Sequence, residues 1–483
     1  MLTEQEIREI ADLGKSEQEV QKQIEKFKNG FPILTALSPA IVGDGIAILT
    51  NEECLKYAGS YEMSDLEVVK FVPASGAASR MFKSLNTAII NNEESDEIKL
   101  FAASINKFAF SNLVSSELSS IEIANYVLEK EGLNYRSLPK GLIEFHKYDN
   151  KPRTPFEEHL FEACLYGSNN GLAKVHFTIS KDHAYIIQTL VEGCIDNLKS
   201  IFNISVEIEY SNQMSTTDTV ALDEKGSLMR GDGKILFRPA GHGALIQNLN
   251  NINADIIFVK NIDNVVKESL IGDTVLYKKA LAGILIELIN KIHLLLDGLL
   301  KDPSEEVLNN SVNFIKTELG VDLVLEAKNL ESKIHFVYRY LNRPVRIAGM
   351  VKNGGEPGGG PFWVKDNKYV KSLQIVEEVQ INKEDPEQRS ILEASTHFNP
   401  VDLVCYVKNH KGDKFDLLKY VDQDAGLIAD KSLEGKSIKI LELPGLWNGA
   451  MADWITLFVE VPVTTFNPVK TVFDLLKPSH QAD

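Results

Sequence analysis

The feature that most constrains the fold is an alternation of short apolar runs with segments of helical spacing. The runs are rich in β-branched residues, as buried strands are, and the segments between them repeat their apolar residues every three or four positions. Alternation of this kind predicts a doubly wound α/β sheet, whose ligands bind at the carboxyl ends of the strands. The strand-like runs are 66–72, 174–179, 204–210 and 255–259.

Other segments flank or interrupt this alternating region. Thr3 and Glu6 form a capping-box pattern, so the chain is expected to begin with a helix. After residue 346 strand-like runs return, and we expect an α+β portion there. The predicted parts are an N-terminal helical segment (1–65), an α/β domain (66–380) with helical insertions (84–137 and 265–342), and a C-terminal portion (381–483).

The charge balance argues against two classes of partner. Lys plus Arg number 51 and Asp plus Glu number 68, a formal net charge of −17. Such an acidic chain is not expected to bind nucleic acid or an anionic membrane. The most apolar stretch, 280–300, contains Glu287, Lys291, His293 and Asp297 and is therefore expected to be a buried or amphipathic helix, not a membrane span. We therefore expect a cytoplasmic protein; the sequence does not predict its oligomeric state.

A loop of small residues follows the first predicted strand and ends at Arg80. Small side chains let backbone N–H groups approach a phosphate, and an arginine supplies a delocalised charge for its oxygens. The alternative is a tight turn with a surface arginine, because short motifs of this kind recur by chance. The residues expected to contact phosphate are Ala74, Ser75, Gly76, Ala77, Ala78 and Ser79.

This loop and a later segment resemble the sugar-nucleotide pyrophosphorylases. VPASGAASRM is similar to the L-A-G-G-x-G-T-R-M loop of that family, with Ser75 and Ala78 in place of glycines and Ser79 in place of threonine. LPKGLIEFHKY, from Leu138, looks like the P-K-x-L segment that follows the loop in the family. The resemblance implies that Arg80 and Lys140 contact phosphate and act in catalysis.

A third segment resembles the UDP-sugar and UDP-N-acetylhexosamine pyrophosphorylases. FRPAGHGALIQNLNNINADIIFVKNIDNV, from Phe237, looks like their P-P-G-H-G and N-x-D-N pair. The resemblance implies that Gly241, His242 and Gly243 lie against the nucleotide. Asp263 follows a predicted strand, and a lone carboxylate there suits Mg²⁺, which binds one or two carboxylates plus phosphate oxygens. The alternatives are a helix cap for Asp263 and a structural hydrogen bond for His242.

Further short segments, in the same order as in the family, extend the resemblance towards residue 472. Gln213 follows the strand-like run 204–210 and would read the uracil edge; the alternative is a solvated loop glutamine. FNPVKTVFDLL looks like the F-x-P-V-K segment of the UDP-N-acetylglucosamine pyrophosphorylases, which implies that Lys470 reaches the phosphates, although an exposed lysine is the alternative. A glycine-rich loop and the strand after it are similar to the sugar-side segments of this superfamily. The implied sugar-binding residues are Glu356, Gly358, Gly359 and Glu377, the last with a strand-edge charge as its alternative.

The resemblance implies a GT-A-like, doubly wound mixed sheet and a Mg²⁺-dependent nucleotidyltransferase. Its substrates would be a nucleoside triphosphate, with UTP favoured, and a sugar 1-phosphate. Two alternatives remain open: a glycosyltransferase that uses a nucleotide sugar, and a non-catalytic nucleotide- or sugar-binding protein, which Ser75 and Ala78 would explain. The whole chain also looks like an uncharacterised bacterial family of unknown function, which the nucleotidyltransferases resemble only distantly.

Overall fold

The chain divides into two compact units, each built from three stretches of sequence. The computed structural model describes residues 2–481, except residues 92, 116, 150, 232, 357, 367–369 and 434–435. Unit 1 comprises residues 1–50, 213–255 and 284–460, and unit 2 comprises residues 51–212, 256–283 and 461–483. The mixed α/β class predicted from the sequence is confirmed, and the three-part division along the chain stays a prediction.

Unit 2 contains the alternating strands and helices. Strands β12, β4, β6 and β7 lie in that order and pair in parallel, and the short strand β5 is antiparallel to β6. Strands β4 and β12 are buried along nearly their whole length, which explains their continuous apolar runs. The strands are β4 (Val68–Pro73), β5 (Ser168–Asn169), β6 (Leu172–Thr178), β7 (Ser205–Ser211) and β12 (Ile256–Lys260).

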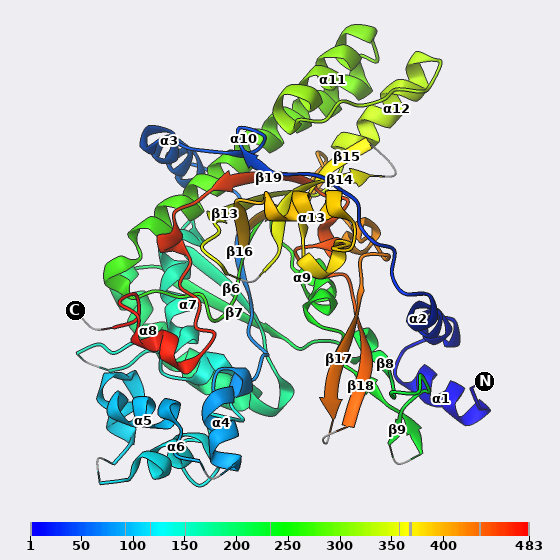
Figure 1. The fold of residues 1–483 in the computed structure, drawn as a ribbon. Coiled ribbons are helices and arrows are strands. Elements are labelled where there is room, and N and C mark those ends of the chain that lie inside the picture. Colours follow the sequence, from blue (N-terminus) through cyan, green and yellow to red (C-terminus); the bar gives the residue numbers. More distant parts are fainter. Residues whose placement is uncertain are drawn as a thin grey trace. The chain divides into compact units, whose positions relative to one another are not determined.

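The helices of unit 2 form two apolar clusters. Helices α7 and α8 pack on the sheet through one cluster. Helices α4, α5 and α6, which lie together in Figure 1, build the second with residues near the C-terminus. The helices are α3 (Asn51–Glu62), α4 (Lys83–Ile90), α5 (Asp96–Ala103), α6 (Ser120–Leu128), α7 (Pro155–Tyr166), α8 (Ala184–Phe202) and the first part of α10 (Gly272–Lys301).

Unit 1 has several sheets. The strand order in its largest part is β2-β3-β19-β13-β16, and smaller sheets have the orders β1-β14-β15, β11-β8-β18-β17 and β9-β10. Strand β13 is parallel to β19 and antiparallel to β16. The strands are β1 (Ala36–Pro39), β2 (Ile41–Val42), β3 (Gly45–Ala47), β8 (Thr219–Leu222), β9 (Arg230–Gly231), β10 (Lys234–Ile235), β11 (Phe237–Arg238), β13 (Val345–Lys352), β14 (Gly360–Asp366), β15 (Val370–Val376), β16 (His397–Tyr406), β17 (Leu427–Leu433), β18 (Lys436–Glu442) and β19 (Ile455–Glu460).

The first helices of unit 1 follow from local sequence signals. Thr3 with Glu6 and Ser16 with Glu19 form complete capping boxes, and Gly30 ends the second helix with a φ of 73°. The helices of this unit are α1 (Glu4–Asp12), α2 (Glu17–Asn29), α9 (Ile246–Asn251), the rest of α10, α11 (Glu305–Leu319), α12 (Leu330–Leu341) and α13 (Pro386–Glu393).

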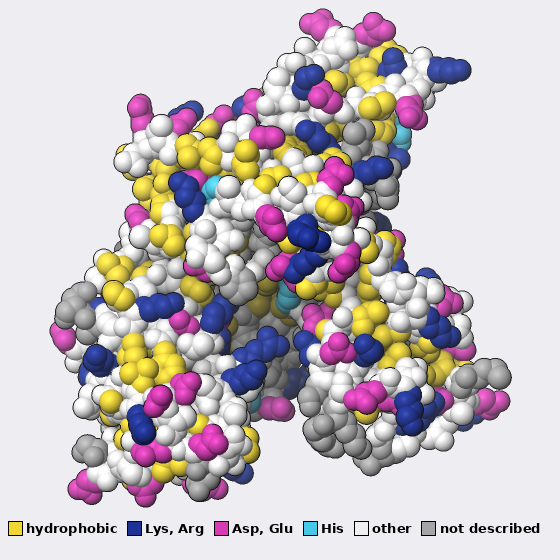
Figure 2. Space-filling view, in the orientation of Figure 1, with side chains coloured by type: hydrophobic (Ala, Val, Ile, Leu, Met, Phe, Trp, Pro, Cys, Tyr) yellow, Lys and Arg dark blue, Asp and Glu magenta, His cyan; other side chains and the backbone are white. Residues whose placement is uncertain are grey.

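The distribution of surface charge and the apolar character of the helices bear on the partners expected from the composition. Figure 2 shows acidic and basic side chains interspersed over the face in view, so the net charge of −17 is not gathered into one patch there. Among the described residues, no helix combines the length and apolar character that crossing a membrane requires.

Candidate functional site

A carboxylate that holds two ammonium groups lies just past the carboxyl end of β12 in unit 2. The Lys140 Nζ donates to Asp263 Oδ2 at 2.9 Å, and the Lys470 Nζ lies 3.4 Å from the same oxygen. Asp263 is only 8% exposed. Burial raises the pKa of Asp263, but Lys140 and Lys470 outweigh it and hold that pKa below its ordinary value. The carboxylate is therefore ionised, and the three side chains carry a net charge of +1.

Lys140 belongs to a segment that lies against the small-residue loop. The Lys140 N–H donates to the Gly76 carbonyl at 3.1 Å, and the Ala78 N–H donates to the Leu138 carbonyl at 3.0 Å. Ala77 and Pro139 form an antiparallel bridge between these hydrogen bonds. The two segments that resemble a phosphate-binding motif, separated in sequence by the helical insertion, are thus side by side in space.

The loop residues themselves differ in exposure. Ala74 and Ala78 are buried, Ser75 is half-buried, and Gly76, Ala77, Ser79 and Arg80 are exposed. The Ala78 side chain belongs to the apolar cluster of the insertion, so its methyl group packs into the core and not over the loop. No described residue forms a hydrogen bond or ion pair with Arg80, so its guanidinium is available to a ligand. A 3₁₀ turn, Ala78–Arg80, separates the loop from helix α4.

A buried group of charges that sequence reasoning missed lies within the same unit. Lys70 Nζ lies 2.8 Å from Glu162 Oε2, and Lys260 Nζ lies 2.8 Å from Glu162 Oε1. The Tyr166 hydroxyl also donates to Glu162, at 2.8 Å. Burial raises the pKa of Glu162, but the two lysines outweigh it and hold that pKa well below its ordinary value. Burial lowers the pKa of Lys70 to about 7.

The sequence contained a signal for this group. Lys70 lies within one apolar strand run and Lys260 directly follows another, and a charged residue in such a place is almost never buried unless it is paired. Lys70 is opposite Phe258 in the parallel register of β4 and β12. Because alternate residues of a strand share a face, Lys70 and Lys260 point to the same side of the sheet. The carboxylate on α7 that pairs with both could not be identified without the fold.

His159, on α7, holds the backbone that leads to Asp263. Its Nε2 lies 3.1 Å from the Asn261 carbonyl and 3.2 Å from the Ile262 carbonyl. Two carbonyl oxygens can only accept, so the proton of the neutral ring is on Nε2. Burial and the nearby Lys70 lower the pKa of His159 well below its ordinary value, and the ring is neutral at pH 7. The loop carrying Asp263 therefore rests on a fixed donor.

Asp263 fits a metal ion only as a single ligand. The described residues contain no group of three or more His, Cys, Asp or Glu side chains placed to hold a metal. Both lysines contact Oδ2, and within the described part of the chain Oδ1 accepts no hydrogen bond. Mg²⁺ commonly binds one or two carboxylates plus the oxygens of a substrate phosphate. This donor set suits a metal that arrives with a phosphate ligand.

The glycine–histidine–glycine loop lies in unit 1, against residues 444–447 of the same unit. The His242 and Trp447 rings stack, with centroids 4.2 Å apart and an angle of 13°. The Leu446 N–H donates to His242 Nδ1 at 3.0 Å, so the proton of a neutral ring is on Nε2. A Cβ at Gly243 would lie 2.2 Å from the Pro444 carbonyl oxygen, so only glycine fits there. Gly241 has a φ of 77°.

Glu377 joins the same cluster of unit 1. Its Oε1 accepts a hydrogen bond from Asn448 Nδ2 at 2.6 Å and lies 3.9 Å from His242 Nε2. His242 lowers the pKa of Glu377, and burial opposes that effect. The structure therefore brings one predicted nucleotide residue, His242, together with one predicted sugar residue, Glu377.

The other predicted sugar residues lie on the glycine-rich loop of unit 1. Glu356 is exposed and accepts from the Gly354 N–H at 2.8 Å. The Gly359 carbonyl accepts from the Asn399 N–H at 2.8 Å, and Gly358 is exposed. Pro357, within this loop, lies outside the described residues. Among the described residues of unit 1, no hydrogen bond or ion pair joins Glu356 to Glu377, so the structure does not bring these two candidates together in that way.

Gln213 lies at the start of the second stretch of unit 1. Its Nε2 is buried, and it has no hydrogen-bond partner among the described residues. A buried amide donor without a partner costs free energy, so a ligand that accepts from it would recover that cost. This state suits the predicted reading of a base edge.

The comparisons with known proteins give one family. A family model described as "Domain of unknown function (DUF4301)" matches residues 3–481. No curated protein matches the chain.

Several solved structures are similar to the chain at low identity. UDP-glucose pyrophosphorylase from Leishmania major matches with 14% identity and a TM-score of 0.44, covering 99% of this chain and 79% of that one. UDP-glucose phosphorylase from Trypanosoma brucei matches with 12% identity and a TM-score of 0.45, covering 98% and 77%. The inositol-1-phosphate CTP transferase from T. maritima matches with 9% identity and a TM-score of 0.29, covering 82% and 86%.

Proposed function

The chain belongs to the family described as "Domain of unknown function (DUF4301)", and for this member we propose a nucleotidyltransferase activity. The enzyme would join a nucleoside triphosphate, preferentially UTP, to a sugar 1-phosphate and release pyrophosphate. The observation that carries the proposal is the convergence of Lys140 and Lys470 on Asp263, beside the small-residue loop that ends at Arg80. A GT-A-like arrangement of the sheet is part of the same proposal.

The reaction needs alignment of two anions more than it needs a protein nucleophile. A phosphate oxygen of the sugar 1-phosphate attacks the α-phosphorus, the bond to the β-phosphate oxygen breaks, and pyrophosphate leaves with that electron pair. Positive groups must offset the repulsion between the reactants and the charge that develops on the leaving group. Lys140, Lys470 and Arg80 supply three such charges within an acidic protein of net charge −17.

Asp263 would keep the two ammonium groups in place before the substrate binds. Lys140 is mostly buried and also donates to the Val469 carbonyl at 2.8 Å, which fixes its position. The Lys470 side chain is 62% exposed and can turn towards phosphate oxygens. Charge-assisted hydrogen bonds of this kind are short and about twice as strong as neutral ones.

Mg²⁺ is the proposed cofactor. Asp263 Oδ1 would supply its one protein ligand, and oxygens of the triphosphate would supply others. When bound, the ion would neutralise charge on the phosphates. The chain's own part is to hold Asp263, through the hydrogen bonds from His159 to the preceding backbone, and to orient the two lysines.

Pyrophosphate release tests the proposal. The protein is incubated with Mg²⁺ and each pairing of four nucleoside triphosphates with a panel of sugar 1-phosphates. Release with at least one pair is expected, and Lys140→Ala is expected to lower kcat by about 10²–10³-fold, as loss of one preorganised donor does. Lys99→Ala, which removes an exposed lysine of α5, is the matched control and should keep full activity.

Two results would contradict the proposal. Equal rates for the wild type and Lys140→Ala would remove the assignment of the site. Absence of release with every pair, together with thermal stabilisation by a UDP-sugar, would favour the non-catalytic binding protein.

A further inference from the structure

We propose that Asn264 and the hydrogen-bonded pair His146 and His480 are positioning residues for Lys470. They anchor the C-terminal tail, defined here as residues 461–481, so that the Lys470 ammonium group reaches Asp263. This inference rests on the proposed function, because it concerns the geometry of that site. All of these residues lie in unit 2.

The first anchoring contacts are hydrogen bonds of the tail residues directly before Lys470. The Asn467 N–H donates to Asn264 Oδ1 at 2.8 Å, and the Val469 N–H donates to the Asp263 carbonyl at 3.1 Å. Asn264 is only 2% exposed. One dipeptide, Asp263-Asn264, thus supplies the carboxylate that Lys470 contacts and the backbone and amide oxygens that set where Lys470 begins.

The second anchoring contacts involve Lys470 itself and the tail residues directly after it. Asp474 accepts from the backbone N–H groups of Lys470 at 2.8 Å and Thr471 at 2.6 Å. The Val472 N–H donates to the Met81 carbonyl at 3.0 Å. Val469, Val472 and Leu475 are buried in the apolar cluster of the helical insertion. These contacts order the turn that carries Lys470.

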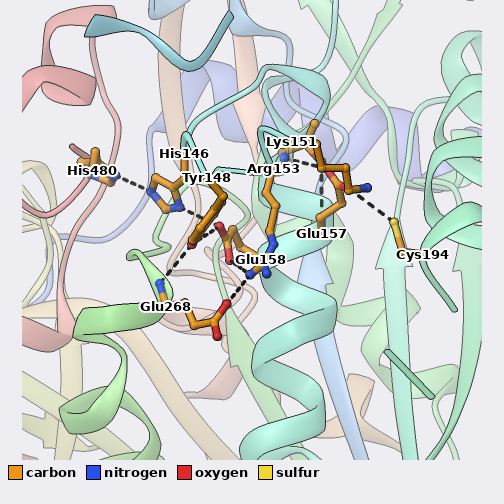
Figure 3. A network of polar contacts seen from close by, with 10 residues as sticks. His146, Tyr148, Lys151, Arg153, Glu157, Glu158, Cys194, Glu268 and His480 are labelled. Carbon is orange, nitrogen blue, oxygen red and sulfur yellow. Dashed lines mark hydrogen bonds and ion pairs between the residues drawn. The ribbon is translucent and has the colours of Figure 1, made fainter. Parts of the chain in front are cut away.

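The third anchoring contact is the hydrogen bond between His146 and His480, which Figure 3 shows. The two imidazole rings meet through His146 Nε2 and His480 Nδ1, 2.8 Å apart. His146 Nδ1 lies 2.8 Å from Glu158 Oε1, which also accepts from the Tyr148 hydroxyl at 2.8 Å. His146, Glu158 and His480 are at most 2% exposed. Because both rings are buried, breaking the hydrogen bond between them would leave further polar atoms without a partner, so His480 has one favoured place.

The contact of Lys470 with Asp263 cannot hold the tail by itself. Its nitrogen–oxygen distance is 3.4 Å and its side chain is 62% exposed, and ion pairs open to solvent contribute little free energy. A lysine side chain is also flexible, so its position depends on its backbone. The buried anchoring contacts must therefore order the turn that carries Lys470. His480 lies ten residues from Lys470 in sequence and has no direct contact with it in the described part of the chain.

A double-mutant cycle separates positioning from general stability. His480→Leu removes the hydrogen bond to His146, whereas His480→Asn, of similar shape, keeps a polar atom at the place of Nδ1. We expect His480→Leu to lower kcat for pyrophosphate release about tenfold and His480→Asn to restore most of it. In a Lys470→Ala background, His480→Leu should cause no further loss. An equal fold-loss in both backgrounds, or no loss in either, would overturn the proposal.

Backbone amide exchange gives a readout that does not depend on activity. His480→Leu and Asn264→Ala should each speed deuterium exchange at residues 467–472 by tenfold or more, and leave the amides of β4 and β12 as slow as in the wild type. His183→Leu, which removes a histidine outside the tail, is the control and should change neither. Unchanged exchange in the tail, or faster exchange throughout unit 2, would overturn the proposal. Absence of pyrophosphate release by the wild type would instead reject the proposed function.

Discussion

At the scale of single residues, the charges of unit 2 form two groups with different exposure. Glu162 with Lys70 and Lys260 is almost completely buried, while Asp263 with Lys140 and Lys470 opens towards solvent through Lys470. A buried ion pair loses its hydration and is costly to break, because a lone charge then remains in the interior. The first group is therefore expected to serve the fold, and the second is the one for which we propose ligand binding.

Replacement of Glu162 by Gln tests the structural role of the buried group. The substitution leaves the Lys70 and Lys260 ammonium groups without a carboxylate, and we expect a loss of about 3–5 kcal/mol in unfolding free energy. Glu207→Gln removes a glutamate of β7 that is 63% exposed and is the control, with an expected change of about 1 kcal/mol or less. Urea unfolding curves measure both, and a loss for Glu162→Gln no larger than that for the control would contradict this role.

At the scale of elements, a close approach of two segments places Lys140. A Cβ at Gly141 would lie 2.6 Å from Cε2 of Phe156, whose ring is fully buried on α7. Only glycine therefore lets the Lys140 turn rest on this helix. The turn in turn holds the small-residue loop through the Gly76 carbonyl.

Gly141→Ala is expected to destabilise the protein by about 1–3 kcal/mol, as overpacking of a core does. It should also lower activity, because Lys140 is the next residue. Gly193→Ala is the matched control: nothing lies within 4 Å of its added methyl group, and alanine favours the interior of α8. Thermal unfolding should show opposite shifts for the two variants; equal shifts would contradict the packing argument.

Elements were more predictable from the sequence than their long-range partners. The apolar runs at β4, β6, β7 and β12 and the capping boxes of α1 and α2 are local patterns, and the structure has strands and helices there. Pairing of Glu162 with lysines on two strands, and of His480 with His146, depends on contacts between distant segments. Family resemblance supplied Lys140, Lys470 and Asp263 as candidates, whereas the stack of His242 on Trp447 had no sequence pattern to indicate it.

At the scale of the whole molecule, buried histidines should make stability depend on pH. Burial and the neighbouring His146 lower the pKa of His480 to about 3, and burial also lowers that of His159. Histidine in the unfolded chain has a pKa of about 6.5. Below that value the unfolded chain binds protons that the folded protein does not, so acid destabilises the fold.

The expected loss from His480 alone between pH 7.5 and pH 5.5 is about 1.4 kcal/mol of unfolding free energy. His480→Asn removes this titration and should reduce the loss by that amount, and urea unfolding at the two pH values measures it. His183→Asn is the control. Identical pH dependence in the wild type and His480→Asn would show that His480 is not held neutral by burial.

The proposed function requires the small-residue loop, Lys140 and Lys470 to surround a triphosphate. Calorimetric titration of the protein with UTP in the presence of Mg²⁺ tests this arrangement. Because charge-assisted hydrogen bonds contribute about 1.5–3 kcal/mol each, Lys140→Ala and Lys470→Ala should each weaken binding by roughly 10- to 100-fold. Lys99→Ala should leave Kd unchanged. Equal affinity of all four proteins for UTP would contradict this arrangement.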